Sequence, residues 1–221
     1  MSGVLSVDLP TLHFSPSAQK TSLLTQEPYS IPCVGFTQTF PFTSRYASEL
    51  MACLDPVEEP FPLIEVGQLA IPDWEEMAER YNITEFNTAI KPFVFMHLFD
   101  QYQHGTVVYL DPDILVMSRM IEMESALREG AEAVMTPHIL EPAENVEISD
   151  VKMLQSGIYN LGLIGLRNTA RVRNIASWWG RRMERECVIN LEQGLFVDQK
   201  WADLFPAFIH QTPAIMWLIG T

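Results

Sequence analysis

The chain has 221 residues, of which 28 are acidic and 14 basic, so its formal net charge at pH 7 is −14. This charge excludes a sequence-independent nucleic-acid binder, because such proteins gain their affinity by neutralising phosphates. Hydrophobic residues make up 48% of the chain and charged residues 19%, which is typical of a globular protein with a sizeable core and excludes a disordered chain.

The three cysteines, Cys33, Cys53 and Cys187, are widely spaced and form no CxxC pattern. They indicate neither a disulfide framework nor a zinc site, so a reducing compartment, the cytoplasm, is expected. The sequence contains no run of about 18 apolar residues and no basic stretch followed by an apolar one at its start. It therefore predicts neither a transmembrane segment nor a secretory signal, and leaves peripheral membrane contact open.

Residues 1–54 are expected to form a poorly specified N-terminal segment. Residues 1–48 contain only four charged side chains and show no sustained period of 2 or 3.6 residues. From Asp55 onward acidic residues dominate and clear structural patterns begin. The sequence therefore predicts a folded domain over residues 55–221.

Two helical segments follow. Pro72 and Asp73, before a run with acids in its first turn, predict a short helix over residues 73–81. Thr84 can cap a second helix, and Pro92 either kinks that helix or begins a new one that reaches Phe99. The apolar face of the second helix is predicted to be core: Phe86, Ala89 and Ile90.

Short apolar runs then alternate with helical patterns. Strands are predicted over residues 106–110, 133–135 and 161–166, and helices over residues 121–128 and 168–186. This alternation predicts an α/β fold in a single domain, with a mostly parallel sheet flanked by helices.

The predicted helix over residues 168–186 has one apolar stripe and an otherwise basic surface. Residues 167–200 carry more basic than acidic side chains in a chain that is strongly acidic overall. The excess indicates either pairing with the acidic segments or a surface for an anionic lipid or a polyanionic glycan. The stripe residues recur at helical spacing: Val172, Ile175, Ala176, Trp179 and Met183.

The strongest chemical signal is an Asp-x-Asp pair directly after a predicted strand. Asp111 and Asp113 flank a proline, so their carboxylates can converge on one hard divalent cation. In an open α/β sheet the ligand crevice lies beyond the carboxyl ends of the strands, where this pair is placed. Surface turns are also rich in aspartate, so the pair alone leaves a plain turn open.

Two later segments could complete such a site. Residues 156–162 place small residues and the amide of Asn160 at a strand entry, which permits close approach of a polar ligand. Residues 194–201 set Asp198 beside Gln199 at a predicted helix start, where they could hold sugar hydroxyls. The alternatives are an ordinary turn and a helix-capping aspartate.

In this order the segments resemble a GT-A type glycosyltransferase, specifically the bacterial relatives of family 8 nucleotide-sugar transferases. The resemblance covers roughly residues 55–209. It is carried by FNTAIKP (86–92), VVYLDPDILV (107–116), TPHILEP (136–142), SGIYNLGLIGL (156–166) and GLFVDQKWADLFP (194–206). It implies a Rossmann-like GT-A sheet and transfer of a sugar from a nucleotide-diphosphate donor, such as a UDP-sugar, to a glycan, lipid-linked or protein acceptor.

The resemblance also implies residue roles. Asp111 and Asp113 would hold Mn²⁺ or Mg²⁺ against the donor diphosphate, and Lys91 would lie near the donor phosphates unless it is simply a surface lysine. Asn160 and Gly162 would lie near the donor sugar. The catalytic pair that contacts the sugar and the acceptor would be Asp198 and Gln199.

Two features depart from that family. Residues 1–54 contain only one weak candidate, residues 34–40, for the first strand that cradles the nucleotide base. Enzymes of that family also take a third metal ligand from a histidine in a C-terminal segment. His210 is the only histidine after Trp201 in this sequence, and it is not assigned to that role. A truncated or degenerate relative without turnover is therefore an alternative, and a haloacid-dehalogenase-type phosphatase that uses Asp111 and Asp113 is a more remote one.

Overall fold

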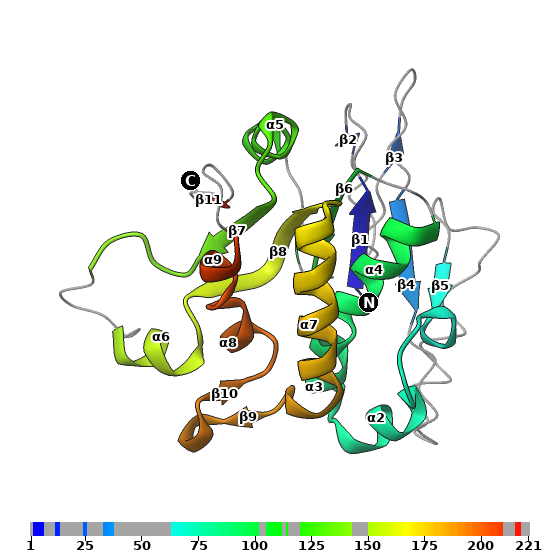
Figure 1. Ribbon diagram of the computed structural model, residues 1–221, viewed down its shortest axis with the longest axis vertical. Helices are drawn as coiled ribbons and strands as arrows, with labels where there is room; N and C mark the ends of the chain where they lie inside the picture. Colours follow the sequence, from blue (N-terminus) through cyan, green and yellow to red (C-terminus); the bar gives the residue numbers. More distant parts are fainter. Residues whose placement is uncertain are drawn as a thin grey trace.

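The computed structural model describes residues 2–6, 12–13, 24–25, 33–37, 63–101, 105–111, 114, 120–142, 150–209 and 215–217. These residues form a mixed α/β domain built on a seven-stranded sheet (Figure 1). From one edge to the other the strands are β11 (Ile215–Trp217), β7 (Ala133–Pro137), β8 (Tyr159–Arg167), β6 (Thr106–Leu110), β1 (Ser2–Ser6), β4 (Cys33–Thr37) and β5 (Leu63–Glu65).

The prediction of a mostly parallel sheet is wrong. Strand β8 runs antiparallel to both of its neighbours, β6 and β7, and β1 runs antiparallel to β4 and β6. Among the strands that the structure describes, only β11 with β7 and β4 with β5 pair in parallel. Burial explains the error, because a strand covered on both faces is continuously apolar whatever its direction.

Helices cover both faces of the sheet. Tyr109 of β6 packs on Phe95 of α4 (Lys91–Gln101), which in turn packs on Trp179 of α7 (Ala170–Glu186). On the opposite face, Gly165 of β8 lies against Leu127 of α5 (Ile121–Glu129). Side chains alternate between the two faces of a strand, so the sheet separates two apolar layers.

The predicted stripe of α7 is confirmed, since all five of its residues are buried. Trp179 is fully buried in an aromatic cluster and meets Phe205 edge-on, with 5.3 Å between ring centroids. Burying large aromatic side chains removes the most apolar area per residue from water. The helix is therefore anchored by its apolar face, while its other face stays outward.

The segment before β6 contains three consecutive helices. Helix α2 (Trp74–Arg80) confirms the first prediction. Helix α3 (Ile83–Ala89) is capped by Asn82 and not by Thr84, because Asn82 Oδ1 accepts from the amide of Glu85 and the Asn82 backbone amide in turn donates to the Glu85 carboxylate. A new helix, α4, begins one residue before Pro92, which confirms the prediction that a helix begins at this proline and excludes a kink in the preceding one.

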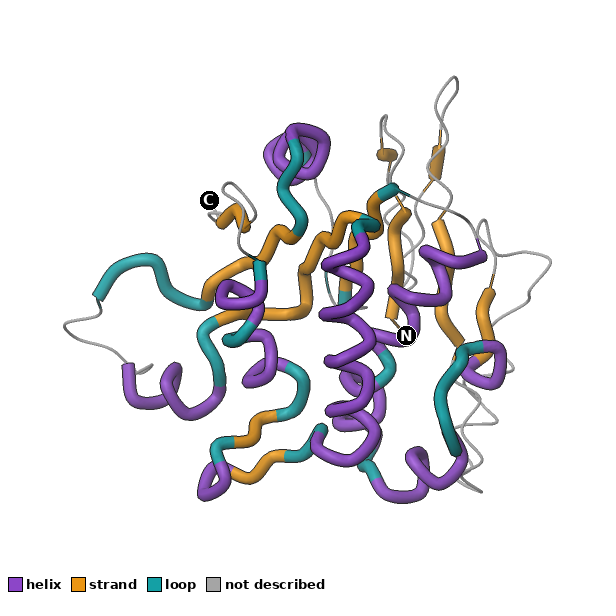
Figure 2. Tube along the Cα trace, in the orientation of Figure 1, coloured by secondary structure: helices purple, strands orange, loops and turns teal. Residues whose placement is uncertain are grey.

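The C-terminal half adds small elements beside β8 (Figure 2). Figure 2 shows α6 (Asp150–Ser156), the hairpin of β9 (Ile189–Asn190) and β10 (Leu195–Phe196), and α8 (Gln199–Ala202) along one side of the molecule. The remaining short elements are η1 (Val66–Gln68), η2 (Leu191–Gln193), α9 (Phe205–Phe208) and the pair β2 (Leu12–His13) and β3 (Leu24–Thr25). Of these elements, α6, β10 and α8 pack together and place residues 194–202 next to β8.

Two strands of the sheet come from residues 1–54. Strand β4 overlaps the weak candidate at residues 34–40, whereas no pattern in the sequence predicts β1. No helix within the described stretches is both long and apolar enough to cross a membrane.

Candidate functional site

The candidate site lies where β6 ends and β8 begins. Because β6 and β7 both run antiparallel to β8, their carboxyl ends meet the amino end of β8 at one edge of the sheet. The amide of Asp111, directly after β6, donates to the carbonyl of Gly162 at 2.7 Å. The β7–β8 register shifts between Met135 and Thr136: Met135 pairs with Ile164 and Thr136 with Asn160, so residues 161–163 of β8 form an irregularity between these two pairs.

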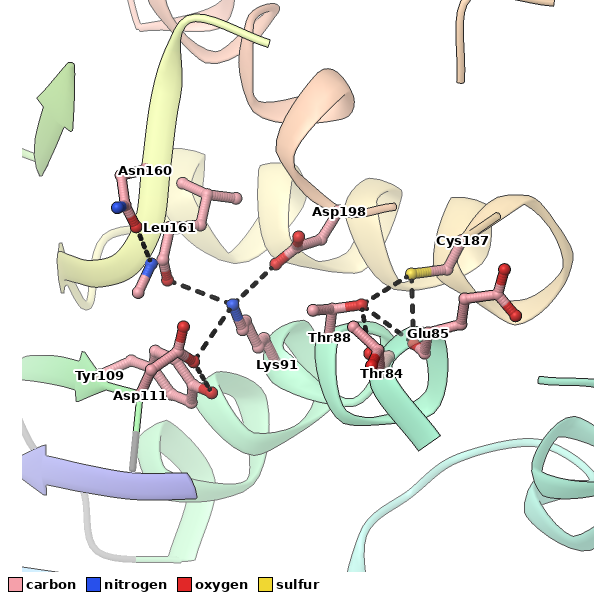
Figure 3. Close-up of polar contacts among 11 residues, drawn as sticks. Thr84, Glu85, Thr88, Lys91, Tyr109, Asp111, Asn160, Leu161, Cys187 and Asp198 are labelled. Carbon is pink, nitrogen blue, oxygen red and sulfur yellow. Dashed lines mark hydrogen bonds and ion pairs between the residues drawn. The ribbon is translucent and has the colours of Figure 1, made fainter. Parts of the chain in front are cut away.

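Lys91 is the buried centre of this site (Figure 3). It opens α4, and its side chain is only 3% exposed. Its Nζ lies 3.0 Å from Asp198 Oδ2 and 3.6 Å from Asp111 Oδ1, and it donates to the Leu161 carbonyl at 3.2 Å. The same ammonium lies over the Tyr109 ring, 4.8 Å from its centroid. The alternative of a surface lysine is therefore wrong.

Asp111 is half-buried and is oriented by two neighbours. The Tyr109 hydroxyl donates to Asp111 Oδ1 at 2.6 Å, and the Lys91 ammonium approaches the same oxygen. The carboxylate keeps 36% of its side-chain surface exposed, whereas Lys91 behind it is shielded. Asp111 therefore presents a fixed carboxylate to any ligand that enters from solvent.

Gly162 provides the space for that carboxylate. A Cβ at this position would lie 2.8 Å from Asp111 Oδ2 and 2.9 Å from Asn160 Oδ1, both closer than real Cβ contacts. Asn160 Oδ1 accepts a hydrogen bond from the Gly162 amide at 2.8 Å. The close backbone approach expected at residues 156–162 is thus made between Gly162 of β8 and the side chains of Asp111 and Asn160, which belong to the site.

Asp198 is buried, with 2% of its surface exposed. It occupies the N-cap position of α8, yet its side chain makes no capping hydrogen bond and pairs with Lys91 instead. The alternative of a capping aspartate is therefore wrong. Gln199 points elsewhere: its Nε2 donates to the carbonyl of Ser156 at 3.0 Å, and its Cγ lies against Gly157, whose φ is +111°.

Two carboxylates share one ammonium here. Burial alone lowers the pKa of Lys91, but the carboxylates of Asp198 and Asp111 outweigh it and raise that pKa, so the ammonium stays charged. Burial raises the pKa of Asp198, and Lys91 opposes this rise. The cluster of these three side chains therefore offers two carboxyl groups for one ammonium, a composition that suits a cation better than an anion.

Sequence reasoning missed part of this site. The sequence analysis predicts Tyr109 only as a strand residue, although its place two residues before Asp111 puts both side chains on one face of an extended chain. The buried thiol of Cys187 lies beside the cluster and contacts Thr88 Oγ1 at 3.2 Å. Burial raises the pKa of this thiol, so it is neutral and unreactive. Nothing local to Cys187 could have placed it there.

One candidate remains untested by the structure. Asp113 lies outside the described residues, as does His210, to which no role is assigned. Across the stretches that the structure describes, no group of three or more His, Cys, Asp or Glu side chains gathers to hold a metal ion. The donor chemistry fits Mn²⁺ or Mg²⁺ at one point: Asp111 supplies hard carboxylate oxygens on a side chain that is 36% exposed to solvent.

Comparison with known proteins returns no family model, no curated protein and no solved structure that matches this chain.

Proposed function

We propose that this protein is a metal-dependent glycosyltransferase of the GT-A type, acting in the cytoplasm. It would transfer a sugar from a nucleotide-diphosphate donor, preferably a UDP-sugar, to a glycan, lipid-linked or protein acceptor. The observation that carries the proposal is the convergence of Lys91, Asp111, Asn160, Gly162 and Asp198 at one edge of the sheet. These residues come from four distant segments that the sequence had singled out for one ligand.

The chemistry of the cluster suits a phosphorylated donor. Asp111, together with Asp113, would hold Mn²⁺ or Mg²⁺, which when bound neutralises the charge that develops on the departing nucleoside diphosphate. Tyr109 and Lys91 fix the Asp111 carboxylate in place. Lys91 can contact a donor phosphate only by exchanging one of its two carboxylate partners, so its first role is to orient them.

Asp198 would act at the sugar, because its buried carboxylate lies on the other side of Lys91 from Asp111. Gln199 follows Asp198 directly, at the first position of α8. A carboxylate kept away from water interacts more strongly with charge on a reacting centre than an exposed one does. Gln199 would reach the acceptor after its bond to the Ser156 carbonyl is released.

Ligand-dependent stabilisation tests the proposal. A ligand that binds only the native state raises its stability by about 2.7 kcal/mol at a hundredfold excess over Kd. We expect UDP with Mn²⁺ to raise Tm, and expect the rise to disappear in Asp111→Asn/Asp113→Asn. The matched control is Asp73→Asn/Asp150→Asn, which removes two exposed carboxylates elsewhere on the surface and should keep the rise.

Three outcomes would contradict the proposal. The first is cooperative melting with no rise for UDP or GDP, which favours the degenerate relative. The second is a rise that persists in the double variant. The third is release of phosphate from an aryl phosphate that Asp111→Asn abolishes, which favours the phosphatase. Release of UDP from a UDP-sugar with an acceptor present would extend binding to turnover.

A further inference from the structure

The outward face of α7 differs in charge from the rest of the molecule. Trp178, Arg181, Arg182 and Arg185 are spaced by three and four residues, so they share one side of the helix. The opposite side is the buried apolar stripe described above. Arg181, Arg182 and Arg185 are exposed, in a chain whose net charge is −14.

The three arginines are poorly neutralised compared with others on α7. Arg171 pairs with Glu132 at 2.8 Å and Arg173 with Asp100 at 2.6 Å. Within the described part of the chain, no acidic side chain pairs with Arg181 or Arg185, and Arg182 reaches only Glu186 at 3.4 Å. Arg185 lies in the last turn of α7, where the helix dipole stabilises a positive charge. Arg181 and Arg182 lie before that turn, so the dipole does not explain their presence.

Apolar surface adjoins these arginines. Trp178 packs on Phe208 of α9 with 4.9 Å between ring centroids, and on Trp201 of α8 at 5.9 Å. At the start of α9, Leu204 is 43% exposed, and Pro206 and Ala207 are exposed as well. Figure 1 shows α8 and α9 beside α7 on the same side of the sheet. Through Trp178, the face of α7 that carries the arginines therefore adjoins α8 and α9, and the exposed apolar side chains lie at the start of α9.

This combination fits a lipid surface better than a glycan. An acidic glycan would use ring faces as stacking platforms, but the guanidinium of Arg182 already covers Trp201, 5.5 Å from its centroid. Guanidinium groups bind phosphates in a bidentate manner. Exposed apolar groups beside them can enter the boundary between headgroups and acyl chains.

We propose that the surface formed by Arg181, Arg182 and Arg185 of α7, with the exposed Leu204 and Ala207 at the adjoining α9, binds bilayers that contain anionic phospholipid. The attraction is local, since the rest of the acidic molecule is repelled by the same bilayer. Binding should therefore weaken steeply as salt rises above physiological strength. The proposal does not depend on the nucleotide or on the metal.

Co-sedimentation with vesicles tests it, using phosphatidylcholine with and without phosphatidylglycerol. We expect binding only to the vesicles with phosphatidylglycerol, and a loss of roughly fivefold in partitioning per arginine replaced by serine. Arg185→Ser and Arg128→Ser form a matched pair, because each removes one exposed arginine in the last turn of a helix. Of this pair, Arg185→Ser should weaken vesicle binding and Arg128→Ser should not. Leu204→Ser should also weaken vesicle binding, without a change in charge.

Several results would overturn the proposal. Equal partitioning into neutral and anionic vesicles would do so, as would no partitioning into either. Equal effects of the two single arginine variants would show that only net charge matters. Retention on immobilised heparin without vesicle binding would assign the surface to a polyanionic glycan.

Discussion

At the scale of single residues, Lys91 has the largest consequence for stability. Replacing Lys91 by methionine leaves Asp198 buried without a counter-charge, and breaking a buried pair in this way costs about 3–5 kcal/mol. We expect Lys91→Met to lower the free energy of urea unfolding by that amount. Lys91→Met/Asp198→Asn, which removes both charges, should recover most of the loss.

The control for this variant is Lys200→Met. Lys200 pairs with Asp203 at 2.9 Å, and the two side chains are 26% and 14% exposed, against 3% for both Lys91 and Asp198, so solvent screens the Lys200 pair more. We therefore expect Lys200→Met to cost less than Lys91→Met. Equal losses for Lys91→Met and Lys200→Met would show that the Lys91 pair is no more sensitive to deletion than a screened one.

Tyr81 makes stability depend on pH in the alkaline range. Its hydroxyl donates to the Met183 carbonyl at 2.8 Å and accepts from the Cys187 amide at 3.0 Å. Burial raises the pKa of Tyr81 from 10.0 to about 12. Between these values the unfolded chain releases this proton and the folded one retains it, so stability falls as pH rises.

Tyr81→Phe isolates this contribution. We expect the urea midpoint of the wild-type protein to fall more steeply from about pH 9 to about pH 11 than that of Tyr81→Phe. Other groups titrate in this range in both proteins, so the difference between the two slopes reports Tyr81. Parallel slopes would mean that the hydroxyl ionises as easily in the folded protein as in the unfolded one.

At the scale of elements, the contact between β6 and β8 shapes the candidate site. Gly162→Ala would force its Cβ against Asp111 Oδ2 and Asn160 Oδ1. We expect this variant to lose at least tenfold in affinity for UDP with Mn²⁺, measured by calorimetric titration. Gly105→Ala is the control, because a Cβ there meets nothing within 4 Å. Similar affinities for the two alanine variants would show that the contact of Gly162 with Asp111 and Asn160 does not affect ligand binding.

How far the sequence predicts these elements depends on how local their causes are. The period of α7 and the apolar run of β6 are local patterns, and both elements form within a few residues of their predicted bounds. The direction of β8 is not local, because it depends on which strands flank it. The cap of α3 was missed since Asn82 and Thr84 are both good capping residues, and only the reciprocal bond with Glu85 decides between them.

The candidate site divides in the same way. The sequence placed Asp111 at the end of a strand and Gly162 where the backbone had to approach closely, and both positions follow from neighbours in the chain. The pairing of Lys91 with Asp198 could not be read from the sequence. It depends on where α4 and α8 pack, which long-range contacts determine.

At the scale of the whole molecule, the net charge of −14 opposes compaction. Like charges repel one another in the folded state, and salt screens them with a Debye length of about 10 Å at 0.1 M. We expect Tm in scanning calorimetry to rise as sodium chloride is increased from about 0.05 M to about 0.5 M. A falling Tm would mean that attractive pairs such as Lys91 with Asp198 outweigh the general repulsion.

The central position of β8 also determines when the protein can fold during synthesis. Strand β8 separates β6 from β7, and the Leu161 carbonyl that Lys91 contacts is 70 residues downstream of it. Asp198 follows about a hundred residues after Lys91, a delay of roughly 5–20 s at the usual rates of translation. Throughout this interval the growing chain holds an ammonium whose buried partner has not been made. The centre of the sheet therefore closes late, and a chaperone that shields β6 would act in this interval.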